Sequence, residues 1–98
     1  MVNRIEMELP GYKVSINDGI CIINNQKIKI TKEDVDNIIR TIRTWDNIYK
    51  SNSITEEVYN IYLYDNEDNL LDEFLFEGNY PSLFSNLLEL IGELYARR

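Results

Sequence analysis

An acidic turn in the second half of the chain has the densest set of potential metal ligands. Asp65, Glu67 and Asn69 have the spacing of the first, third and fifth ligands of an EF-hand calcium loop. Leu70 stands where that loop needs glycine, and Phe76 stands where it needs a glutamate that binds through both carboxylate oxygens. The segment therefore predicts a solvated hairpin turn, and we expect no metal site.

The remaining residue types also argue against catalysis. The chain has no histidine, which removes the commonest general base and the commonest zinc ligand. Cys21 is the single cysteine and lies in an apolar run, so we expect a buried thiol in a reducing compartment. Asp72 and Glu73 are neighbours on an expected strand, and their carboxylates therefore point to opposite faces. No glycine-rich phosphate loop or nucleophile elbow occurs. We predict a protein that is not an enzyme and binds no cofactor.

Charge is distributed unevenly along the chain. The 98 residues carry a net charge of −7, which argues against direct binding to nucleic acid. Residues 1–50 are close to neutral, whereas residues 51–98 hold ten acids and, as their only bases, Arg97 and Arg98. Such an asymmetry between halves indicates an interaction surface.

The segment 31–49 has the clearest helical pattern. Thr31 suits the N-cap, and Asp34 follows at the spacing of a capping box. Trp45 has two interpretations, a core anchor between helix and sheet or an aromatic that stacks on a ligand. The apolar stripe, at steps of three and four residues, consists of Val35, Ile38, Ile39, Ile42, Trp45 and Tyr49.

Strand patterns precede and follow this helix. Residues 4–30 contain three or four short apolar runs separated by turn residues, and the last run, with lysines at 27 and 29, suits a sheet edge. A second helix is expected after Pro81. Within it Gly92 permits close packing, and Glu93 and Arg97 have the spacing of an ion pair.

Residues 57–64 and 70–77 predict a hairpin whose register follows from the side-chain pattern. Opposing residue 65 to residue 70 places Tyr59, Ile61 and Leu63 on one face with Leu70, Phe74 and Phe76. A slip of one residue would bring Glu73 into the core, which is costly. The other face then carries Val58, Asn60, Tyr62, Tyr64, Leu71, Glu73, Leu75 and Glu77.

These elements predict an α+β fold. We expect one domain over residues 1–98, in two layers, with an antiparallel sheet and two helices on one face of it. The expected order is three or four strands, a helix, two strands and a helix.

The exposed face of the second hairpin is the candidate site. Tyrosines among acids suit a protein interface, and we expect a basic protein as partner. The alternatives are a homodimeric interaction module and a small-molecule binder with a pocket beneath Trp45. The residues predicted to bind a partner are Tyr62, Tyr64, Asp65, Glu67, Asp68, Leu71, Glu73, Leu75 and Glu77.

The N-terminal residues lack the apolar core of a signal peptide, and no apolar run has the length of a membrane span. We therefore expect a cytoplasmic protein without membrane contact. The Ile-, Asn-, Lys- and Tyr-rich composition suggests a low-GC bacterium or its phage.

In size, acidity and architecture the whole chain resembles the small inhibitors carried by phages and mobile elements, such as anti-CRISPR proteins. It is also similar in these respects to toxin-immunity proteins. This resemblance implies stoichiometric inhibition of a nucleic-acid-handling or toxic protein, without catalysis. No motif carries it, so it assigns no functional residue.

Overall fold

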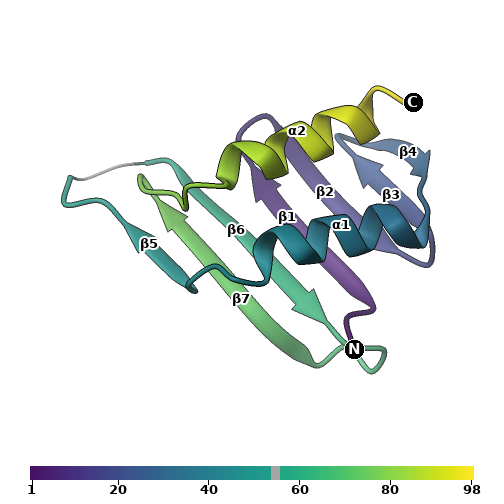
Figure 1. Cartoon of the computed structure of the whole chain (residues 1–98), viewed down its shortest axis with the longest axis horizontal. Coiled ribbons are helices and arrows are strands. Elements are labelled where there is room, and N and C mark those ends of the chain that lie inside the picture. Colours follow the sequence, from purple (N-terminus) through teal and green to yellow (C-terminus); the bar gives the residue numbers. More distant parts are fainter. Residues whose placement is uncertain (54–55) are drawn as a thin grey trace.

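The computed structural model describes residues 1–53 and 56–98, and its strands form one seven-stranded sheet (Figure 1). The strand order is β4-β3-β2-β1-β6-β7-β5. The predicted class is confirmed: this is a small α+β domain with a mostly antiparallel sheet. Its elements are β1 Arg4–Leu9, β2 Tyr12–Asn17, β3 Ile20–Ile23, β4 Gln26–Lys29, α1 Lys32–Ile42, β5 Ile48–Lys50, β6 Val58–Tyr64, β7 Leu70–Glu77 and α2 Phe84–Tyr95.

The first four strands follow one another through tight turns that their residue types explain. Gly11 joins β1 to β2 at φ 81°. Asp18 and Gly19 join β2 to β3, and Asn24 and Asn25 join β3 to β4, all with positive φ. Glycine, asparagine and aspartate tolerate this conformation best. The meander leaves β4 at an edge of the sheet, as its two lysines predicted.

β1 lies in the middle of the sheet because it also pairs with β6. The two strands are antiparallel, with Met7 opposite Ile61 and Glu6 opposite Tyr62. This pairing joins the first fifty residues to the acidic second half of the chain. The sequence patterns did not predict it.

α1 is shorter than the predicted helix 31–49. It ends at Ile42, and the chain then forms the short strand β5, parallel to β7. In β5, Tyr49 stacks on Phe76 with ring centroids 5.7 Å apart. The end of the apolar stripe therefore reaches the core from a strand. The helical spacing was misleading because a longer helix and the strand β5 both place the Tyr49 ring against the core.

The start of α1 has the predicted capping box. Thr31 accepts a hydrogen bond from the Asp34 backbone, and the Asp34 carboxylate accepts one from the Thr31 backbone. The Arg97 guanidinium also donates two hydrogen bonds to Asp34, at 2.7 and 3.1 Å. Among the described residues the close ion pair of Arg97 is with Asp34, and its predicted partner Glu93 adds a weaker charge attraction. Arg97 ties the end of α2 to the start of α1.

Replacing Asp34 with asparagine is expected to lower the free energy of unfolding at pH 7 by about 1–2 kcal/mol. The bonds from Arg97 and Thr31 lower the pKa of Asp34 from 3.8 to about 2. A lowered pKa stabilises the fold above the unfolded-state value, and this contribution is lost as pH falls from about 4 to about 2. Urea unfolding at pH 7 and at pH 2.5 measures both effects, with Asp36→Asn on the same helix as the control. A gap between wild type and Asp34→Asn that stays constant over this range would contradict the assignment.

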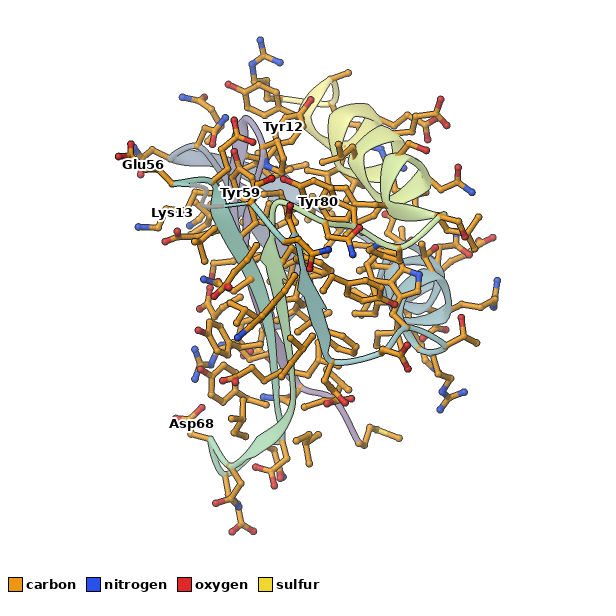
Figure 2. The ribbon with its side chains drawn as sticks, turned by 90° about the vertical axis from the view of Figure 1, so that its left-hand side faces the viewer. Tyr12, Lys13, Glu56, Tyr59, Asp68 and Tyr80 are labelled. Carbon is orange, nitrogen blue, oxygen red and sulfur yellow. The ribbon has the colours of Figure 1, made fainter. Side chains whose placement is uncertain are left out.

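Both helices lie on the same side of the sheet in Figures 1 and 2. They share one buried cluster with the strands, and beside this cluster Gly92 of α2 comes close to Tyr12 of β2. A Cβ at Gly92 would lie 3.1 Å from the Tyr12 hydroxyl, so glycine permits this approach. The largest fully buried side chains are Phe74, Phe76, Ile5, Met7, Ile23, Ile38, Ile42, Ile61, Leu87, Ile91, Val14 and Cys21.

Candidate functional site

The strand residues that alternate with the buried ones form the surface that we call the open face. Figure 2 shows Lys13 and Asp68 on the side of the sheet away from the helices. Most side chains of the open face are polar or aromatic, and each is exposed or half-buried. By alternation and register the open face consists of Arg4, Glu6, Glu8, Lys13, Ser15, Asn17, Ile20, Ile22, Lys27, Lys29, Ile48, Lys50, Val58, Asn60, Tyr62, Tyr64, Glu73, Leu75 and Glu77.

Tyr62 lies near the centre of the open face between two acids. The cross-strand partners of Tyr62 are Glu6 on β1 and Glu73 on β7. Side chains directly opposite each other in adjacent strands are neighbours on one face. The structure thus brings together Tyr62 and Glu73, which the sequence predicted, and adds Glu6 and Glu8. The alternation of residues 4–9 already put these two acids on a polar face, but only the sheet order places them beside Tyr62.

A hollow of about 420 Å³ lies beside Tyr62 on the open face. Its walls include Glu6, Glu8, Ser15, Ile22 and Asn60. The Ser15 hydroxyl donates a hydrogen bond of 2.9 Å to Glu6 Oε1, which holds this carboxylate in place. The hollow therefore combines two acids, an aromatic ring and an apolar surface.

Arg4 partly neutralises the acidic end of the open face. Its guanidinium forms ion pairs with Glu6 at 3.1 Å and with Asp68 at 3.3 Å. It also lies over the Tyr64 ring, 3.9 Å from the centroid. Two of the predicted partner-binding residues, Tyr64 and Asp68, are thus already in contact with a cation of the same chain.

Asp65 organises the hairpin turn. Its Oδ1 accepts backbone hydrogen bonds from Glu67 at 2.8 Å and from Asn69 at 2.9 Å, and its Oδ2 accepts one from the Asn69 side chain. The bonds from Asn69 and then from Glu67 lower the pKa of Asp65. This geometry gives Asp65 a structural role in the turn.

The carboxylates of the open face differ in whether they form hydrogen bonds or ion pairs within the chain. Glu77 lies 4.0 Å from the Lys50 ammonium. Within residues 1–53 and 56–98, the carboxylates of Glu8 and Glu73 form no hydrogen bond or ion pair. These two exposed carboxylates are therefore the ones most available to a cationic partner.

The register of the β6–β7 hairpin is confirmed from Val58 to Leu63, and a bulge then shifts it so that Tyr64 opposes Leu70. This corrects two predictions. Leu70 was expected in the core and is 52% exposed. Leu71 was expected among the open-face residues, but it lines a groove of about 830 Å³ beside α1. The bulge breaks the strict alternation that both predictions assumed.

Cys21 lies in the core, and Trp45 is partly buried and packs against it. Trp45 meets Phe76 edge to face at 6.0 Å, and its buried indole N–H has no hydrogen-bond partner within the described residues. This packing matches the core interpretation of Trp45. Burial raises the pKa of the Cys21 thiol to about 11, which keeps it protonated and unreactive at neutral pH.

Comparisons of the chain with protein-family models, with curated proteins and with solved structures find no match. Neither helix in the described part of the chain is long and apolar enough to cross a membrane.

Proposed function

We propose that this chain is a non-enzymatic, cytoplasmic protein that binds and blocks a basic partner protein through the open face. In this proposal the two helices form one layer and leave the other face of the sheet free. The observation that carries it is Tyr62, flanked by Glu6 and Glu73 beside an open hollow. Tyrosine supplies apolar area and a hydroxyl at a small cost in conformational entropy.

The acids are spaced for a partner with several cations. Glu6 and Glu8 lie two residues apart on β1, a distance of about 7 Å along a strand. Glu6 and Glu73 lie two strands apart, about 10 Å across the sheet. A surface that binds the nucleic-acid backbone presents clustered lysine and arginine, so it is complementary to such an array. This supports a nucleic-acid-handling or toxic protein as the target.

Capture from a lysate of a low-GC bacterium tests the proposal. The wild-type chain is expected to retain a basic protein that the variant Tyr62→Ser/Glu73→Lys does not retain. The control, Tyr95→Ser/Glu89→Lys, carries the same changes on α2 and is expected to capture like the wild type. Retention should weaken between 0.1 and about 0.5 M salt, because salt screens exposed charge pairs.

A partner that binds wild type and the open-face variant equally would overturn the proposal. So would a partner that is lost only with the α2 control. Thermal unfolding of both variants tests whether a loss of fold causes a loss of capture. We expect both variants to fold, because both pairs of changes lie outside the fully buried core.

A further inference from the structure

The open face has opposite charge at its two sides. The β4-β3-β2 side carries Lys13, Lys27 and Lys29, and the only charged side chains of these strands that lie on this face are these lysines. The β1-β6-β7 side carries Glu6, Glu8, Glu73 and Glu77, with Arg4 as its cation. A face divided in this way is complementary to itself after a half-turn.

Side chains that lie directly opposite one another on adjacent strands form rows across the open face. The central row runs across six strands from β4 to β7 and changes from a cation through an apolar and a polar residue to acids around an aromatic ring. In order it consists of Lys27, Ile22, Ser15, Glu6, Tyr62 and Glu73.

We propose that the open face binds a second copy of this chain, face to face, about a two-fold axis that runs parallel to the strands between β1 and β2. This rotation lays β4 over the partner's β7, β3 over its β6 and β2 over its β1, and it keeps each row opposite itself. Lys27 then faces the partner's Glu73. Ile22, which is 40% exposed, faces the partner's Tyr62.

The neighbouring row fits the same arrangement. Lys13 and Glu8 are cross-strand partners, and the rotation puts Lys13 opposite the partner's Glu8. Each contact occurs twice because the interface is isologous. Glu8 and Glu73, the two open-face carboxylates without a hydrogen bond or ion pair within residues 1–53 and 56–98, thus each receive a lysine from the other copy.

The hollow beside Tyr62 supplies the matching shape. It lies over Ser15 and Ile22, the position that the partner's Tyr62 reaches after the rotation. Its volume of about 420 Å³ leaves room for a phenol ring. In this arrangement the ring of each copy fills the hollow of the other.

The area of the face indicates which size class of interface this dimer belongs to. β3 and β4 have four residues each, so only four residues of each strand overlap at the two sides, against six in β1 and β2. With strands about 4.8 Å apart and about 3.3 Å per residue, the footprint is about 450 Å² per copy. The total of about 900 Å² lies in the range of weak, transient interfaces, so we expect a dissociation constant of about 10–100 µM. This inference does not depend on the proposed function. The dimer also requires the lysines of β2 and β4, whereas binding of a basic partner does not.

Sedimentation velocity between about 5 and 300 µM tests the dimer, in a range that brackets the expected dissociation constant. The wild type is expected to sediment as a dimer at the upper concentrations. Lys27→Glu and Glu73→Lys should each dimerise at least about tenfold more weakly than the wild type, because each creates two like-charge pairs across the two-fold axis. An equimolar mixture of the two variants should form dimers again, since both pairs are then of opposite charge.

Lys32→Glu and Glu89→Lys, which make the same charge changes on the helices, are the controls and should dimerise like the wild type. A wild type that stays monomeric at 300 µM overturns the inference, and so does a mixture that fails to dimerise. Lys27→Glu also separates this inference from the proposed function. It weakens self-association, but it leaves the acids and Tyr62 for a basic partner.

Discussion

Replacing Phe76 with alanine is expected to lower the free energy of unfolding by about 3–5 kcal/mol, the largest effect of any single substitution considered for this chain. Phe76 is a fully buried residue of β7 that packs against both α2 and β5. Its ring lies 5.0 Å from that of Phe84 and 6.0 Å from that of Trp45, and it stacks on Tyr49 and Tyr80. The cavity left by alanine would remove these contacts together. Urea unfolding followed by Trp45 fluorescence measures the loss.

Leu75→Ala is the matched control, because Leu75 is the neighbour of Phe76 in β7 and is only half-buried on the open face. We expect its cost to be about 1 kcal/mol or less. Equal losses for the two variants would show that the aromatic cluster does not contribute more than an ordinary strand position.

Reversing both Glu8 and Glu73 to lysine is expected to weaken binding of the basic partner by at least about 100-fold, the largest effect on function. These carboxylates are exposed and, within the described residues, unpaired, so reversal adds repulsion without breaking an internal ion pair. Isothermal titration at a chain concentration below about 1 µM measures the affinity where self-association does not compete.

The variant Glu89→Lys/Glu93→Lys changes the net charge by the same amount on α2. It should lower the affinity by less than about tenfold, since long-range attraction alone then changes. An equal loss in both variants would show that net charge drives binding, without a defined site on the open face.

The open face has two uses in these proposals, and they are mutually exclusive. The second copy and the basic partner both require Glu73 and Tyr62. Self-association would therefore reduce the concentration of chains able to bind the partner, and the partner would dissociate the dimer by mass action. At concentrations far below the dimer dissociation constant, the chain would be monomeric and its acids available.

Local structure followed closely from residue type. The capping box of Thr31 and Asp34, the turns at Gly19 and Asn25 and the register around Ile61 agree with the sequence patterns. These features depend on contacts between residues that are close in the chain or on strict strand alternation. Both signals are present in the sequence itself.

Predictions failed where two structures satisfy the same pattern. The spacing of Tyr49 fits a helix, but pairing of β5 with β7 buries the same ring. Alternation placed Leu71 on the open face, but a bulge next to the turn changed its position. A bulge of one residue leaves no clear mark in the order of apolar residues.

For the candidate site, the sequence determined which residues share a polar face: Tyr62 with Glu73 on one hairpin, and Glu6 with Glu8 on another strand. The tertiary structure alone decided that these two sets are adjacent, because β1 pairs with β6 across more than fifty residues of chain. It also decided that Arg4 binds Asp68, which removes part of the predicted acidic surface. Strand order depends on contacts between distant segments, and local periodicity does not encode them.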